Sequence, residues 1–395
     1  MDYISAKAAA EKWGVSLRRV HQYCEEKRIE GQARVGNAWV IPAAAEKPSD
    51  PRQQRQRAPA ASEDKLPMPL MSGSFLPGEA RKYIRGLQDE ELKAVAIGEY
   101  AYFSGNIAGA IAATERLLDN ESVAVRSSAM LVHAFSCIEQ NDIRAARDDF
   151  RRMQETAAVN AVRPGIDSRE RAVCMLISSL TNILLHDRRL PSARLDEAVR
   201  YLPEGMKLYA CYAMAHQHYL NGDYHRSLGI AETALSLASR SYPISMIYLN
   251  LAAAMAYMAV KDTEQASAAF ARAWDLAKRD GLIHPFGEHH GLLYGLVEKI
   301  LTRAEPEQYE KIIGITYRFS DGWRKIHNPD TAETVTDLLT TKEFSIAMLA
   351  SKDWSNKEIA AYMELSAHTI KHYMSVIYQK LAISNRDELK RYMLR

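Results

Sequence analysis

Apolar residues near the end of the chain recur at the spacing of an α-helix. At about 100° per residue, four apolar side chains fall within about 60° of Ile370: Tyr373, Met374, Ile377 and Leu381. Polar side chains occupy the other side, between about 100° and 200°: His368, Lys371, His372, Ser375 and Gln379. This pattern predicts a helix with a buried stripe on one side and solvent-facing residues on the other.

Helix-capping residues divide residues 339–395 into four predicted helices. The first start is a capping box, in which Thr340 is followed three residues later by Glu343. The later helices start after Ser355-Asn356, Ser366 and Ser384, and the last runs from Arg386 to Met393. Only Glu364-Leu365 separates the second helix from the cap of the third. This arrangement is typical of a helix-turn-helix, whose second helix enters the DNA major groove.

The motifs in this stretch resemble a known family. LTTKE, SNKEIA, the S-x-x-T-I-K run, I-x-x-K-L and NRDEL are similar to the LuxR-type DNA-binding domain over its whole length. The resemblance implies a four-helix domain whose third helix reads the major groove and whose fourth often helps to pair two copies. One departure is Tyr373, where the family usually has His, and this puts the local phosphate contacts in question.

The same resemblance implies roles for particular residues. Three positions match the base-reading sites of the family: Lys371, His372 and Ser375. Three others match positions near the DNA phosphates: Ser366, Thr369 and Lys380. The alternative reading of residues 339–395 is a helical module for protein–protein contacts.

Residues 3–42 predict a second small module. A helix starts after Ser5 and ends at Gly14, where glycine suits the C-terminal cap. Another helix starts after Ser16 and is followed by a two-stranded hairpin that turns at Gly36-Asn37. The residues expected to face inward are Ala9, Ala10, Trp13, Leu17, Val20 and Cys24, and the expected strands are Ala33–Val35 and Trp39–Ile41.

Helix, tight turn, helix and hairpin make a winged helix-turn-helix, and the order resembles the excisionase and MerR-like DNA-binding family. The resemblance implies that residues 1–45 place the second helix in the major groove and the hairpin on the backbone. The implied groove residues are Arg18, Arg19 and Gln22, and those of the wing are Arg34 and Asn37. A winged module used for protein contacts or dimerisation is the alternative.

Residues 46–78 differ in composition from both neighbours. Half of the chain's 14 prolines lie between Pro42 and Pro77, among Ala, Ser and Gln. Such a segment buries too little apolar surface to offset the entropy of ordering, so we expect a flexible linker.

Residues 79–329 show a helical pattern with an internal repeat. An apolar helix reaches a turn and is followed by an Ala-rich helix, with turns at Gly105, Asn141, Gly222 and Lys261. Residues 185–187 supply a further turn, so the period is about 36–40 residues. The pattern resembles the tetratricopeptide-like helical hairpins of large LuxR-type regulators. Stacked hairpins leave a concave groove for a peptide, a small-molecule effector or a second subunit. Residues 330–338 are expected to be a short linker.

Composition limits the partners that the chain can have. The 395 residues suffice for two or three domains, and 47% hydrophobic and 25% charged residues are ordinary for a globular protein. The net charge is only +2, so no overall basic field points to nucleic acid. The last 56 residues hold nine Lys or Arg against six acids. Because this surplus is small, we expect several modules or a dimer to gather enough phosphate contacts.

The chain carries no sign of export, membrane insertion or catalysis. Its four cysteines are far apart without a CxxC pair, and the start lacks signal-peptide features. We therefore expect a cytoplasmic location. No phosphate-binding loop, nucleophile elbow or dinucleotide fingerprint occurs, so we expect neither an enzyme nor a cofactor. The His284–His290 run looks like a turn with capping histidines rather than a metal site.

The sequence thus predicts a mainly α protein: a tetratricopeptide-like α-solenoid between a winged helix-turn-helix and a LuxR-type helix-turn-helix at residues 339–395. The predicted function is sequence-specific transcription regulation as a homodimer or higher oligomer on double-stranded DNA. The competing reading is an interaction scaffold whose terminal modules bind proteins.

Overall fold

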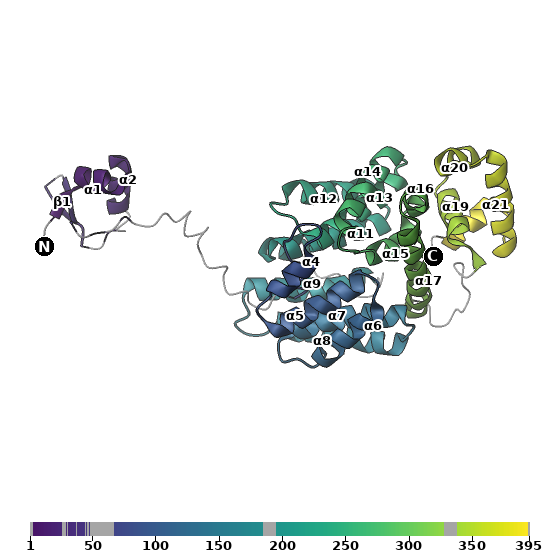
Figure 1. Ribbon diagram of the computed structural model, residues 1–395, viewed down its shortest axis with the longest axis horizontal. Coiled ribbons are helices and arrows are strands. Elements are labelled where there is room, and N and C mark those ends of the chain that lie inside the picture. Colours follow the sequence, from purple (N-terminus) through teal and green to yellow (C-terminus); the bar gives the residue numbers. More distant parts are fainter. Residues whose placement is uncertain are drawn as a thin grey trace. The chain divides into compact units, whose positions relative to one another are not determined.

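The computed structural model describes residues 3–25, 29, 31–36, 38–43, 45, 47, 67–184, 195–327 and 338–393. It divides into two compact units, residues 1–64 and 65–395, and each is described by itself. Regular structure in the described ranges is helical apart from three short strands (Figure 1). None of the described helices has both the length and the apolar character needed to cross a membrane.

The first unit has two helices and a small antiparallel sheet. The helices are α1 (Ala6–Trp13) and α2 (Leu17–Glu25), and the strands are β1 (Tyr3–Ser5), β2 (Ala33–Val35) and β3 (Ala38–Pro42), in the order β1-β3-β2. The Ser5 side chain caps α1 by accepting a hydrogen bond from the Ala8 amide at 3.2 Å. Gly14 ends α1 at a φ of 64°. Strand β1 was not predicted, because its partner β3 lies far along the chain and no hairpin turn marks the pairing.

The core of the first unit lies between the two helices and β3. Ala9, Val20, Cys24 and Ile41 are fully buried, as expected for the helical residues among them. Leu17 was expected to face inward but is 43% exposed. It is the first residue of α2, one turn before Val20, and so lies at the end of the buried stripe.

The second unit begins earlier in the chain than expected. Residues 67–78 fall within the predicted flexible linker, yet Met68, Leu70, Met71 and Phe75 are all buried in the helical core. The apolar side chains of this stretch show no helical or strand period because the chain turns here: the Ser72 amide donates to the Met68 carbonyl at 2.9 Å and the Gly73 amide to the Leu70 carbonyl at 3.1 Å. Helix α4 (Ala80–Gly86) follows directly.

Four helical hairpins make up most of the second unit. They are α5 (Glu90–Phe103) with α6 (Ile107–Thr114), α7 (Val123–Glu139) with α8 (Ile143–Ala161), α11 (Glu204–Leu220) with α12 (Tyr224–Leu237), and α13 (Pro243–Ala259) with α14 (Thr263–Ala277). The elements between them are η1 (Glu115–Leu117), α9 (Ser168–Leu184), α10 (Leu195–Ala198) and η2 (Val199–Tyr201). The further turn predicted at residues 185–187 lies outside the described residues.

All four hairpins turn in the same way. The predicted turn residues have positive φ values: 80° at Gly105, 64° at Asn141, 81° at Gly222 and 65° at Lys261. The next residue in each hairpin is an Asn or Asp whose side chain caps the second helix: Asn106, Asp142, Asp223 and Asp262. The repeated pair of a left-handed residue and a side-chain cap explains why the sequence shows a period.

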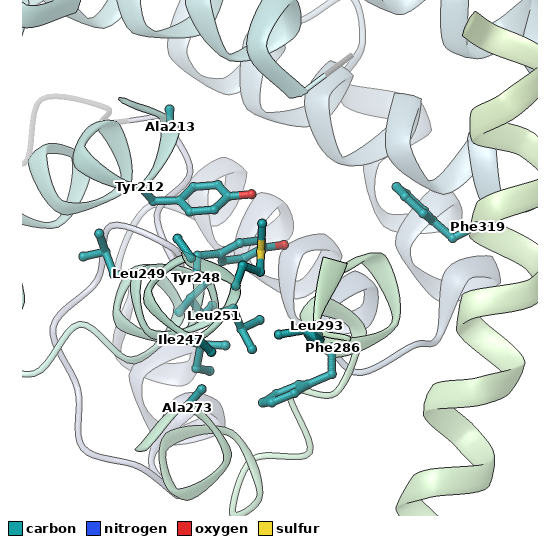
Figure 2. Close-up of a cluster of buried hydrophobic side chains, with 14 of the residues drawn as sticks. Tyr212, Ala213, Ile247, Tyr248, Leu249, Leu251, Ala273, Phe286, Leu293 and Phe319 are labelled. Carbon is teal, nitrogen blue, oxygen red and sulfur yellow. The ribbon is translucent and has the colours of Figure 1, made fainter. Parts of the chain in front are cut away.

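The last helices of the repeat region close its interior. They are α15 (His284–His289), η3 (His290–Leu292), α16 (Leu296–Ala304) and α17 (Pro306–His327). Phe286 of α15 and Leu293 join Tyr212 of α11 and Tyr248 of α13 in one buried cluster (Figure 2). The aromatic residues of the repeats therefore serve mainly as interhelical core.

Four more helices form the C-terminal module: α19 (Thr341–Ser351), α20 (Asn356–Met363), α21 (Ala367–Lys380) and α22 (Arg386–Met393). Their bounds agree with the four helices predicted from capping signals. One cap differs, because the Glu388 amide donates to the Asn385 side chain at 2.9 Å, so Asn385 rather than Ser384 caps α22. Of the predicted linker 330–338, only residue 338 is described.

Candidate nucleic-acid interface

Local hydrogen bonds fix the start of α20. Ser355 and Glu358 form a reciprocal capping box, with the Glu358 amide 3.2 Å from the Ser355 hydroxyl and the Ser355 amide 2.6 Å from the Glu358 carboxylate. At the other end, Glu364 has a φ of 56°, and the Leu365 amide donates to the Ala360 carbonyl at 2.9 Å. The chain therefore reverses within two residues, as a helix-turn-helix requires.

Helix α21 separates its apolar and polar residues as predicted. Ile370, Met374 and Ile377 are buried and pack in one core with side chains of α19 and α20. The exposed residues of the opposite side are His368, Lys371, His372, Ser375 and Gln379. The buried side holds the helix in place, and the exposed side is available to a partner.

The three candidate base-reading residues lie together on this exposed side. Lys371, His372 and Ser375 are within about one helical turn of each other, and all three are exposed. Within the described part of the chain, Lys371 makes no ion pair. Its ammonium group can therefore donate hydrogen bonds to acceptors on base edges such as guanine O6 and N7.

Two of the candidate phosphate-contacting residues lie at the start of α21, where Ser366 is the N-cap. The Ser366 hydroxyl accepts a hydrogen bond from the Thr369 amide at 2.9 Å and lies 2.7 Å from the Thr369 hydroxyl. Both groups sit at the helix N-terminus, where the backbone dipole favours a negatively charged ligand.

The third candidate phosphate contact, Lys380, is engaged inside the module. Its Nζ lies 2.9 and 2.7 Å from the two carboxylate oxygens of Glu343. Burial favours the neutral form of Glu343, but the hydrogen bonds from Lys380 and Thr340 outweigh it and lower the pKa of the carboxyl group. Lys380 thus joins the last turn of α21 to the first turn of α19, a structural role that sequence reasoning missed.

Tyr373, the position that departs from the resemblance, is half-buried. The Nζ of Lys342, from α19, lies 6.0 Å from the centre of its ring, within the range of a cation–π interaction. A basic side chain is thereby held beside α21.

The candidate residues of the N-terminal module are only partly described. Arg18 and Gln22 are exposed on α2, and Arg34 is exposed on β2. The Arg34 guanidinium lies 5.4 Å from the centre of the Trp39 ring, which fixes its position on the hairpin. Arg19 belongs to α2, but its side chain lies outside the description, and so does Asn37 altogether.

The C-terminal module packs against the repeat helices along a surface that we call the seam. Lys261 donates to the Asp353 carbonyl at 3.2 Å and to Glu358 at 3.3 Å. Lys352 donates to the Tyr224 hydroxyl at 3.1 Å. The seam involves α19 and α20, so it leaves the exposed side of α21 free.

Several polar atoms of the seam are buried without a hydrogen-bond partner among the described residues. They are Glu298 Oε2, Ser345 Oγ, Trp354 Nε1 and the Tyr362 hydroxyl. The Tyr362 ring faces the Nζ of Lys299 at 4.5 Å. Burying a polar atom without a partner costs free energy, because the atom loses its hydrogen bond to water. These atoms therefore weaken the packing of the C-terminal module against the repeat helices.

A buried ionic cluster lies in the interior of the repeats. His284 Nε2 is 2.5 Å from Glu139, and His284 Nδ1 is 2.9 Å from Glu288. Arg318 donates to Glu139 at 2.7 Å, and the Tyr248 hydroxyl donates to Glu288 at 2.9 Å. Burial opposes the charged imidazole, but the two carboxylates outweigh it and raise the pKa of His284 to about 9.

This cluster corrects the sequence prediction of a turn with capping histidines. The carboxylate partner Glu139 lies 145 residues earlier in the chain, so no local pattern could reveal it. No group of three or more His, Cys, Asp or Glu suited to a metal ion occurs in the residues that the structure describes.

Comparisons with known proteins agree with the geometry of the C-terminal module. Residues 337–393 match the family described as bacterial regulatory proteins, luxR family. The C-terminal module carries a LuxR-type helix-turn-helix. No solved structure matches the chain.

Three curated relatives are HTH-type transcriptional regulators named MalT. The protein from Vibrio parahaemolyticus is 30% identical over 144 residues, which cover 32% of this chain and 16% of the relative. Those from Vibrio campbellii and Klebsiella pneumoniae are each 29% identical, over 144 and 140 residues, and again 16% of the relative is covered. The match therefore spans about a sixth of the length of these relatives.

Proposed function

We propose that this protein is a sequence-specific DNA-binding transcription regulator whose helix α21 reads the major groove. The observation that carries the proposal is the exposed row of Lys371, His372 and Ser375. It lies on a helix whose other side is buried, within a module that matches the luxR family. The MalT proteins, which are transcriptional regulators by name, support the same class of function.

The roles follow from the chemistry of each side chain. Lys371 donates to purine acceptors, and His372 and Ser375 add hydrogen bonds to neighbouring base edges. Ser366 and Thr369, at the N-terminus of α21, lie near phosphates, as Lys380 does at its other end. These backbone contacts set the register of the helix in the groove, whereas base contacts set the sequence.

In the proposal, the N-terminal module adds a second DNA contact through α2 and the hairpin. Arg18, Arg19 and Gln22 enter the groove, and Arg34 and Asn37 contact the backbone. The exposed side chains of Arg18, Gln22 and Arg34 support this role. Use of the module for protein contacts is the alternative.

The repeat helices serve in the proposal as an effector sensor or an oligomerisation body. A dimer on two half-sites one helical turn apart would supply the phosphate contacts that one weakly charged module lacks.

The test begins with genomic footprinting of the bound protein to obtain an operator. Lys371→Ala combined with Ser375→Ala should weaken operator binding about 10–100-fold or more, because each base contact contributes discrimination of that order. Lys311→Ala, an exposed lysine of α17, is the matched control and should bind normally. Unchanged operator affinity of the double variant would refute the assignment.

Two further measurements separate the alternatives. Removal of residues 1–45 should weaken or redirect binding, and a truncated chain with unchanged promoter binding would reduce the first module to a structural role. Affinity for duplex DNA should fall steeply as salt rises. A scaffold whose modules bind proteins would not be retained on duplex DNA even at low salt.

A further inference from the structure

The repeat helices place a basic side chain at the start of α20, the first helix of the helix-turn-helix. Lys261 lies in the turn between α13 and α14, and it donates to the Asp353 carbonyl at 3.2 Å and to the Glu358 carboxylate at 3.3 Å. Its Nζ also lies 5.6 Å from the centre of the Trp354 ring, within the range of a cation–π interaction. The start of α20 is therefore held from outside its own module.

Helix α16 places two more basic side chains along the rest of α20. The Nζ of Lys299 lies 4.5 Å from the centre of the Tyr362 ring. One turn later in α16, the Nη1 of Arg303 lies 3.7 Å from the carboxylate of Glu364, which is the C-cap of α20. Together with the lysine of the α13–α14 turn, these residues follow α20 from its first residue to its last.

The helix that these cations follow is acidic. From Asp353 to Glu364 the chain has one lysine, Lys357, against three acids, the third being Glu358. The first helix of a helix-turn-helix crosses the DNA backbone, where carboxylates are repelled by the phosphates. The three basic side chains of the repeat helices outnumber this acidic surplus, so the charge that DNA meets beside α20 depends on the repeats.

Arg303 is the most accessible of the three cations. Its side chain is 90% exposed, and that of Glu364 is 65% exposed. Their separation of 3.7 Å is too long for a hydrogen bond, and an ion pair between such exposed groups contributes little to stability. The guanidinium of Arg303 can therefore bind another anion without loss to the fold.

The position of Arg303 brings it close to the entry end of α21. Only Leu365 separates Glu364 from Ser366, the N-cap of α21. Ser366 and Thr369, at this same end, are the candidate phosphate contacts. The second helix of a helix-turn-helix places its N-terminal residues in the major groove, so the DNA backbone passes beside this end.

Two glycines let the repeat helices approach the C-terminal module closely. A Cβ added to Gly295, the N-cap of α16, would lie 3.2 Å from the Met363 Sδ and 3.3 Å from the Ser345 Cβ. A Cβ added to Gly291 would lie 3.1 Å from the Phe344 ring. Helix α16 thus starts in contact with α19 and α20, which fixes where its exposed arginine stands.

We propose that the repeat helices form part of the DNA-binding surface, with Arg303 contacting a phosphate of the operator beside the N-terminus of α21. The inference rests on the proposed function and adds a contact from outside the C-terminal module. A guanidinium matches phosphate geometry with two parallel hydrogen bonds. Glu364 orients Arg303 in the absence of DNA, and Lys261 and Lys299 offset the acids of α20.

The test measures operator binding by the full chain over a range of salt concentrations, using fluorescence anisotropy. Arg303→Gln should weaken binding about three- to ten-fold at about 0.1 M salt and reduce the steepness of the salt dependence by about 0.9, the value for one phosphate contact. Preference for the operator over unrelated duplex should not change. Arg303→Lys should retain most of the affinity. Arg151→Gln, which removes an exposed arginine of α8, is the matched control and should bind as the wild type does.

A double variant separates a phosphate contact from simple neutralisation of Glu364. Arg303→Gln/Glu364→Gln should keep the shallower salt dependence, because the group that met the phosphate is still missing. Its full return to the wild-type affinity and salt dependence would overturn the proposal, as would a single variant Arg303→Gln that binds like the wild type.

The wild-type chain tests the proposed function separately. If it shows no preference for the operator over unrelated duplex, sequence-specific regulation fails, whatever Arg303 does. If it shows that preference and Arg303→Gln leaves affinity and salt dependence unchanged, only the contact from the repeat helices fails.

Discussion

Lys380 Nζ lies within 3 Å of both carboxylate oxygens of Glu343, so the last turn of α21 is tied to the first turn of α19. Glu343 also accepts from the Thr340 amide at 2.8 Å as part of the α19 capping box. One carboxylate therefore starts one helix and orients another, and that second helix carries the proposed DNA-reading residues.

Lys380→Met should destabilise the C-terminal module, because Glu343 then loses its charged partner while 8% of its side chain is exposed. Loss of a charge-assisted hydrogen bond costs about 1.5–3 kcal/mol, measurable as a lower midpoint in urea unfolding. Operator affinity should fall with it only if α21 tilts or if Lys380 contacts a phosphate. The double variant Lys380→Met/Glu343→Gln separates these cases, since it should recover stability but not a phosphate contact.

Stability should depend on pH through His284. Its folded pKa of about 9 is above the ordinary value of 6.5, so its contribution is complete below pH 6.5 and is lost as pH rises through 9. In that window the free energy of unfolding should fall by about 1.4 kcal/mol per pH unit. Thermal melts of the wild type and of His284→Gln between pH 6 and 9.5 measure the effect as a difference.

The wild type must be compared with His284→Gln because His133 also makes the free energy of unfolding fall as the pH rises. Its hydrogen bond to Asp149, at 2.5 Å, raises the pKa of His133 to about 10. This contribution is present in both proteins and cancels. Parallel pH profiles for wild type and His284→Gln would show that the imidazole is not charged in the folded state.

Gly205→Ala should destabilise the second unit, because its new methyl group meets the Ser72 carbonyl and the chain around Ser72 must move. We expect a loss of about 1–3 kcal/mol, as for other overpacked interiors. Gly229→Ala is the control: it is also a helical glycine, in α12, but nothing lies within 4 Å of its new Cβ. It should stabilise by about 0.5–1 kcal/mol. If calorimetry gave the same change in stability for Gly205→Ala and Gly229→Ala, the close approach of Gly205 to Ser72 would be contradicted.

Tyr362→Phe should preserve or strengthen the seam. The hydroxyl is buried without a partner among the described residues, so its removal relieves a desolvation cost of about 1–3 kcal/mol and keeps the ring over Lys299. The protein should therefore melt at an equal or higher temperature. A clear drop in melting temperature would mean that water or another group satisfies this hydroxyl in solution.

Local sequence signals were sufficient to predict the helices of the C-terminal module and the turns of the helical hairpins. Capping residues act within one helical turn, so Thr340 with Glu343 and Ser355 with Glu358 could be read directly from their spacing. The turn at Lys261 was found by aligning the internal repeats, and the Asp that follows it caps the next helix. The exposed row containing Lys371 followed from helical period alone.

The remaining features depend on contacts between distant parts of the chain. Residues 67–78 have the proline-rich composition of a linker, yet they are held by distant partners that include Glu99 and Asp280, 29 and 202 residues from Leu70 and Gly78. Likewise, the charge of His284 depends on Glu139 from another helix. Composition and periodicity carry no information about such pairings.

The seam between α19–α20 and the repeat helices buries polar atoms whose hydration changes when its two surfaces separate. Four of its buried polar atoms have no hydrogen-bond partner among the described residues, and they regain hydration when the two surfaces separate. Rehydration of these four atoms offsets part of the packing energy that is lost when the C-terminal module separates from the repeat helices.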